Sequence, residues 1–139
     1  MAQTSLPDLR PELDLTALSV ARYPAGWWPS AAPTGYVALV VDRDEVTVVA
    51  PDEMFEGFDA PGAIENGWRR ITFAGPLPWE MVGFLADVAD RLAQARIPFT
   101  SMSGFSTDHV LVRAAQAGVA LTVLRGEPPP DLRPDVTNP

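Results

Sequence analysis

Short segments of alternating hydrophobic and polar residues, rich in valine, predict that β-strands make up much of this chain. The expected strands cover residues 15–23, 36–41, 45–50, 68–74, 97–103 and 109–113. Asp42–Asp44 suits a tight antiparallel turn and therefore predicts a hairpin. Glycine and proline recur through residues 51–67, so this stretch is expected to be a loop with at most one irregular helical turn.

Two segments carry a helical pattern instead. In residues 78–96 the apolar residues Met81, Leu85, Val88 and Leu92 recur at helical spacing, with charged residues largely on the opposite face. Pro78 suits the first helical position. A shorter helix is expected at residues 115–125, ending at Gly126.

The order of these elements predicts an α+β fold, an antiparallel sheet with helices packed on one face. A length of 139 residues fits one compact domain or two small halves that share a core. Residues 1–12 and the proline-rich residues 127–139 lack hydrophobic periodicity, and both are expected to be flexible.

Composition excludes several classes of function. Ten basic against 18 acidic residues give a net charge of -8, which argues against binding to nucleic acid or to an anionic membrane. The absence of cysteine rules out disulfides, thiolate nucleophiles and cysteine metal sites. The first residues contain no apolar run suited to a signal peptide or anchor, so a cytoplasmic protein is expected, with no metal or cofactor.

The start of the long predicted helix is a candidate binding site for a carboxylate. Neither Pro76 nor Leu77 offers a side-chain oxygen as a cap, which leaves the amides of Trp79, Glu80 and Met81 exposed at the positive end of the helix dipole. Water, or Glu80 folding back, would satisfy them equally well. Gly83, expected one turn inside the helix, would allow close approach of a ligand or of another backbone.

A second candidate site is the turn that follows the strand at 97–103. Ser101–Asp108 places hydroxyls and a carboxylate around Gly104, an arrangement that suits the ammonium group or the side chain of a ligand. The competing interpretation is a turn whose polar groups bond one another. The four tryptophans, including Trp79, are expected to fill the edges of a core or a subunit contact.

His109 is the only histidine, so a hydrolase or transferase would need it beside a serine such as Ser103 or Ser106. No G-x-S-x-G elbow is present, and a second histidine for a metal site is missing. A structural histidine is therefore expected, and the chain is not expected to be an enzyme.

Three stretches resemble the tandem ACT-like domain proteins of bacteria, which are related to the ACT repeats of the CASTOR arginine sensors. These are D-E-V-T-V-V-A-P at 44–51, G-W-R-R-I-T-F-A-G-P-L at 67–77 and S-M-S-G-F-S-T-D-H-V-L-V at 101–112. In the last motif, Phe105, Thr107 and Asp108 are in register with the family pattern.

The resemblance implies two ferredoxin-like, ACT-like halves, residues 13–66 and 67–126, that form a regulatory homodimer and bind a free amino acid or a similar zwitterion. The carboxylate would take the amides after Pro78, and the ammonium or side chain would meet Asp108 and carbonyls near residues 103–105. The expected ligand-binding residues are Gly75, Leu77, Trp79, Glu80, Met81, Ser103, Gly104, Phe105, Thr107 and Asp108. The alternative is a ligand-free module for dimerisation or protein interaction.

Overall fold

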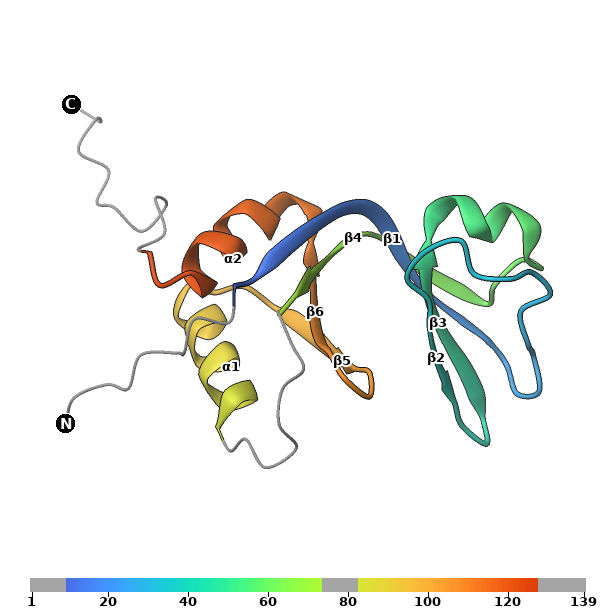
Figure 1. The fold of residues 1–139 in the computed structure, drawn as a ribbon. Helices are drawn as coiled ribbons and strands as arrows, with labels where there is room; N and C mark the ends of the chain where they lie inside the picture. The colour runs from blue at the N-terminus through green and yellow to red at the C-terminus, as the bar shows by residue number, and fades with distance from the viewer. Residues whose placement is uncertain (1–9, 74–82, 128–139) are drawn as a thin grey trace. The chain divides into compact units, whose positions relative to one another are not determined.

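The computed structural model describes residues 10–73 and 83–127, which form β-strands and helices (Figure 1). In chain order the elements are β1 (Glu12–Pro24), β2 (Ala38–Val41), β3 (Glu45–Pro51), the 3-10 helix η1 (Asp52–Gly57), β4 (Ala63–Thr72), α1 (Phe84–Gln94), β5 (Phe99–Ser103), β6 (Asp108–Arg113), the 3-10 turn η2 (Ala114–Gln116) and α2 (Ala117–Leu124). The predicted α+β fold class is confirmed.

The chain forms two compact units. One is Leu15–Arg69, and the other contains the described residues 10–14, 70–73 and 83–127. The long strands β1 and β4 each contribute residues to both units. Glu12, expected in a flexible tail, is the first residue of β1. The division into ACT-like halves at residues 66 and 67 stays a prediction.

In the unit Leu15–Arg69 the strand order is β2-β3-β1-β4. The predicted hairpin is confirmed, since β2 and β3 pair antiparallel and Asp42 N–H donates to the Glu45 carbonyl across the turn. A buried cluster lies on one face of β1 and β3, where alternate valines and alanines meet Tyr23 and Met54. Met54 comes from η1, so this short helix closes the core of the unit.

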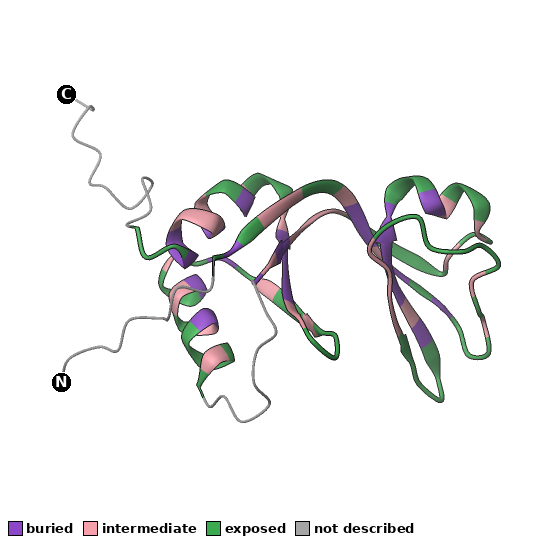
Figure 2. Ribbon diagram, viewed as in Figure 1, coloured by how far each residue is buried: buried purple, intermediate pink, exposed green. Residues whose placement is uncertain are grey.

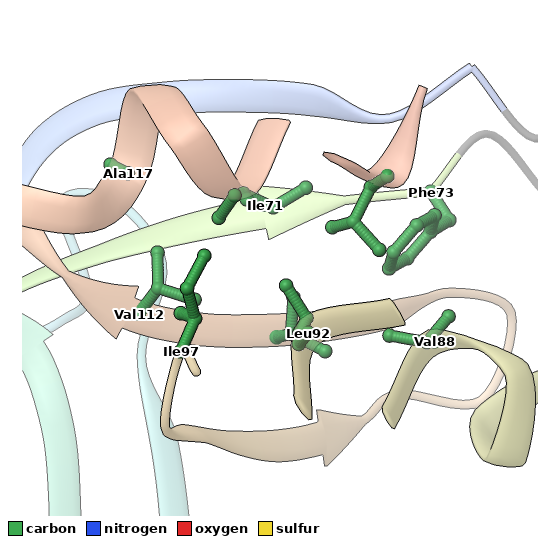
Figure 3. Close-up of a cluster of buried hydrophobic side chains, with 10 residues drawn as sticks. Ile71, Phe73, Val88, Leu92, Ile97, Val112 and Ala117 are labelled. Atoms are coloured by element: carbon green, nitrogen blue, oxygen red, sulfur yellow. The ribbon is translucent and has the colours of Figure 1, made fainter. Parts of the chain in front are cut away.

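In the other unit the strand order is β1-β4-β6-β5, and both α1 and α2 contribute buried side chains to the core. Alternate residues of β4 and β6 meet the apolar stripe of α1, as Ile71, Phe73, Val88, Leu92 and Val112 illustrate (Figure 3). Phe73 also meets Phe84 edge to face, with ring centroids 5.2 Å apart. Buried positions concentrate on the facing sides of these helices and strands (Figure 2).

Two predicted boundaries are wrong. β4 begins at Ala63, within the stretch expected to be a loop, because exposed residues at its start hide the alternating pattern. The long helix begins at Phe84 and not at Pro78, and Gly83 is its N-cap at φ +87°. That backbone conformation favours glycine and stops a helix from extending through it. Gly83 therefore marks the start of α1 and is not an interior residue of the helix.

Both helices of this unit end in a Schellman motif. At the end of α1, Arg96 N–H donates to the Ala93 carbonyl and Ile97 N–H to the Leu92 carbonyl. The predicted end of the second helix is confirmed, because Gly126 at φ +85° follows its last turn. Within residues 10–73 and 83–127, no helix combines the length and hydropathy that crossing a membrane requires.

Candidate functional site

The turn between β5 and β6 brings several of the predicted site residues together. Ser103 and Asp108 are register partners at the end of the hairpin, and Ser103 Oγ donates to Asp108 Oδ1. Gly104 N–H donates to the Thr107 carbonyl at 2.8 Å. A Cβ atom on Gly104 would lie 3.2 Å from Thr107 Oγ1, so glycine lets the threonine hydroxyl approach closely. Phe105 at the tip is 82% exposed.

His109 connects this turn to a polar network on β4. Its Nε2 lies 2.9 Å from Thr107 Oγ1, while its Nδ1 lies 3.2 Å from both Thr72 Oγ1 and Arg70 Nη1. Arg70 also donates to Thr72 Oγ1 and forms an ion pair with Asp14 at 2.9 Å. All of these residues belong to one unit, and Arg70 and His109 are largely buried. The network therefore holds the start of β6 against β1 and β4.

The network determines which nitrogen of His109 carries the proton. A guanidinium can only donate, so Nδ1 must accept and the neutral ring carries its proton on Nε2. Nε2 then donates to Thr107. Burial lowers the pKa of His109 below its ordinary value of 6.5, and the charge of Arg70 lowers it further, against a smaller opposing effect of Asp108. The imidazole is neutral at physiological pH.

Such a histidine is a poor general base. A base needs an unprotonated nitrogen aimed at a nucleophile, yet Nε2 carries a proton and Nδ1 accepts from Arg70. The expectation that His109 is structural agrees with this arrangement. Ser103, one of the two serines considered as its partner, donates its hydroxyl to Asp108 instead.

Some of the predicted site residues lie together in the structure, and others lie outside the described residues. Ser103, Gly104, Thr107 and Asp108 form one hydrogen-bonded turn, and Phe105 in this turn is exposed. Half of the expected set lies outside the described residues, namely Gly75, Leu77, Trp79, Glu80 and Met81. Trp79, Glu80 and Met81 precede Gly83, the N-cap of α1, and the geometry predicted for their amides lies outside the described residues. Their role in binding stays a prediction.

Sequence reasoning missed the partners of His109. Asp14 and Arg70 lie 56 positions apart and meet only because β1 and β4 contribute to the same unit. The one available signal was the polar alternation of Arg70 and Thr72 with Ile71 and Phe73 in a strand. That pattern reveals a polar face but not the groups that it meets.

Comparisons with known proteins agree with this fold. A family model described as ACT domain matches residues 63–126, which include β4, α1, β5, β6 and α2. The comparison with curated proteins gives no match.

Three solved structures share the fold. A structural-genomics target from Agrobacterium tumefaciens has a TM-score of 0.68 at 24% identity, covering 80% of this chain and 82% of its own. A protein of unknown function from Vibrio cholerae has a TM-score of 0.67 at 24% identity, covering 84% and 87%. The regulatory subunit of aspartate kinase from Thermus flavus has a TM-score of 0.64 at 12% identity, covering 84% and 95%.

The family match extends over one region, so a tandem ACT repeat and a relationship to the CASTOR sensors stay predictions. The match and the three shared folds support one identification: the chain has a ferredoxin-like α+β fold, and its residues 63–126 match the ACT domain.

Proposed function

We propose that this chain is a regulatory module that binds a free amino acid, or a similar small zwitterion, at the β5–β6 turn. The observation that carries the proposal is the placement of the Asp108 carboxylate beside the Ser103 hydroxyl, at a largely exposed turn inside the region that matches the ACT domain. The likeness to a regulatory subunit of aspartate kinase supports a regulatory role.

The chemistry of the turn suits an ammonium group. Ser103 bonds Oδ1 of Asp108, and the carboxylate has a second oxygen that can accept from a ligand. Thr107 Oγ1 accepts a hydrogen bond from His109 Nε2–H, which leaves the threonine hydroxyl able to donate to a ligand. We propose that the ligand carboxylate is taken by residues 75–81, which lie outside the described part of the chain.

The chain acts, on this proposal, as a sensor in the cytoplasm and not as an enzyme. His109 is held as a neutral donor to Thr107, so it does not supply a base for acyl or phosphoryl transfer. Binding would instead change the affinity of the module for a partner, most simply a second copy of this chain.

The rival function is a ligand-free module for dimerisation or protein interaction. Two observations favour it: Asp108 already has a partner within its own hairpin, and Phe105 at the tip is 82% exposed. In that case the turn would be a contact surface and not a ligand site.

Thermal unfolding in the presence of each standard amino acid separates the two functions. A ligand that binds only the folded chain raises the melting temperature, by the equivalent of about 2.7 kcal/mol at one hundred times its Kd. The sensor function predicts such a shift for at least one amino acid at millimolar concentration. If none produces a shift, while light scattering shows a dimer, the interaction module is the better description.

Two variants then locate the site. Asp108→Asn keeps an oxygen that can accept from Ser103 but removes the charge, and Asp108→Ala removes both. Both should abolish the thermal shift, and Asp108→Asn should do so with little change in the melting temperature of the free protein. The matched control is Asp44→Asn, an 86% exposed carboxylate in the β2–β3 turn. Unchanged binding in Asp108→Asn would place the site elsewhere.

A further inference from the structure

A cavity lies within the unit Leu15–Arg69, beneath the loop at residues 28–33. Its volume is about 420 Å³, and its other walls are Val37, Leu39, Met54 and Phe58. Pockets that bind small molecules commonly have volumes of about 300–1,000 Å³ and mostly apolar linings. This cavity meets both criteria without any residue of the β5–β6 turn.

The walls of the cavity are held in place by a series of aromatic contacts. Phe58 packs edge to face against Trp27 and Phe55, with ring centroids 5.4 Å and 5.6 Å apart. Trp27 in turn stacks on the buried Tyr23 at 3.8 Å and donates through Nε1 to Asp59 at 3.2 Å. Such contacts fix the ring of Phe58, so the cavity exists before a ligand arrives.

The cavity has an acidic neighbour. A second hollow of about 380 Å³ shares Ala31, Ala32 and Met54 with it and is also lined by Glu53 and Glu56. Both glutamates are exposed residues of η1. Among the described residues that line the two hollows, none is basic. The combined surface is therefore apolar at one end and negatively charged at the other.

We propose that the cavity binds a small organic cation, a protonated amine with an aromatic or branched apolar body. The body would fill the space between Met54, Phe58 and the loop, and the ammonium would lie at Glu53 and Glu56. Trp28, 67% exposed, lines the same cavity and offers an aromatic ring against which the apolar body of the ligand can pack. This site is independent of the proposed amino-acid site.

The negative charge of Glu53 and Glu56 disfavours amino acids, which are the ligands proposed for the β5–β6 turn. A zwitterion would bring its carboxylate toward Glu53 and Glu56, and like charges in proximity oppose binding. A simple amine carries no such group. The two sites therefore differ in the ligands that they admit, and they can be tested separately.

Three probes with the same phenyl body and different charges test the proposal: 2-phenylethylamine, 2-phenylethanol and 3-phenylpropionate. Ligand-observed saturation-transfer NMR and tryptophan fluorescence titration of the full chain would measure their affinities. We expect saturable binding of the amine, binding of the alcohol about two- to fivefold weaker, and the weakest binding for the propionate. Absence of saturable amine binding, or equal affinity for all three probes, overturns the proposal.

Variants assign the binding to the cavity. The double variant Glu53→Gln with Glu56→Gln should remove the preference for the amine over the alcohol. Its matched control, Glu45→Gln with Glu65→Gln, changes the same charge at exposed residues of the same unit and should retain the preference. Loss of the preference in the control, or its retention in the Glu53 and Glu56 variant, contradicts the assignment.

Val37→Phe fills the cavity from a half-buried position and should abolish binding of all three probes, with folding verified by circular dichroism. Should this variant fail to fold, the pair of glutamine variants decides the question alone. Asp108→Asn should leave amine binding unchanged, so a failure of the amino-acid site and a failure of this site give different results.

Discussion

Ser103 Oγ donates a hydrogen bond to Asp108 Oδ1, and these two residues are also register partners at the end of the β5–β6 hairpin. The bond spans the turn in which Gly104 N–H donates to the Thr107 carbonyl. A side-chain bond and a backbone bond therefore close the same turn. The carboxylate proposed to hold a ligand is oriented by its own hairpin.

Ser103→Ala should lower the free energy of unfolding by about 0.5–1 kcal/mol, since a bond to a charged group is lost but the turn is open to water. Urea denaturation measures the change. Ser101→Ala, on an exposed residue of the same strand, is the control and should have little effect. Equal destabilisation by the two variants would show that the Ser103 bond contributes nothing to the folded state.

His109 should make the chain less stable as the pH falls. Its pKa is lowered in the folded state, by burial and then by Arg70, so the unfolded chain takes up a proton that the folded chain does not. The stabilisation is fully present above the ordinary pKa of 6.5 and is lost as the pH falls through the folded-state pKa. Denaturation measured from about pH 8 to about pH 5 should show this slope.

His109→Gln provides the comparison for that slope, because His109 is the only histidine in the chain. The variant should lose stability at every pH through its altered hydrogen bonds, yet vary less with pH between about 5 and 7. The slope of the free energy of unfolding against pH therefore reports on His109 even if the variant is less stable overall. An identical slope in both proteins would assign the pH dependence to other groups.

Arg96→Gly should stabilise the chain. Arg96 has φ +61° at the end of α1, where a Cβ atom makes the left-handed conformation unfavourable. Removing the Cβ atom should raise the free energy of unfolding by about 0.5–1 kcal/mol. The greater entropy of glycine in the unfolded chain offsets part of this gain. Calorimetry would show a higher melting temperature.

Gly126→Ala is the opposite experiment at the end of α2. Gly126 has φ +85° and the nearest atom to an added Cβ would be Arg91 Nη1 at 3.8 Å, so the strain is conformational and not steric. This variant should lower the melting temperature where Arg96→Gly raises it. Shifts in the same direction would contradict the Schellman assignment.

Ser19→Ala should be more damaging than any exposed serine substitution. Ser19 is fully buried in its unit, donates to Asp52 and accepts from Asn66 Nδ2 at 2.6 Å. Removing the hydroxyl leaves two polar groups without this partner and should lower the free energy of unfolding by about 1–3 kcal/mol. A urea midpoint unchanged from the native chain would contradict this role.

The strand and helix types were predictable because they depend on local periodicity. Valine-rich alternation and the Asp42–Asp44 turn indicated β2 and β3, and the spacing of Val88 and Leu92 indicated α1. The start of α1 was not predictable in the same way. Pro78 satisfies the sequence rules for a first helical residue, but the backbone conformation of Gly83 begins the helix later.

Part of the candidate site was also visible in the sequence, since Ser103, Gly104, Thr107 and Asp108 are close in the chain and any tight turn brings them together. The cavity beside Phe58 was not visible. It needs the loop at 28–33, β2 and η1 to meet across intervening strands.

The sequence alone determined the α+β class, the two hairpins and the exclusion of cysteine chemistry, because each follows from residue type and spacing over a few positions. Only the tertiary structure decided the protonation of His109 and the contact of Asp14 with Arg70. The physical reason is that such contacts depend on which side chains share one face of the folded sheet. Residues 56 positions apart meet there only after the strands have paired.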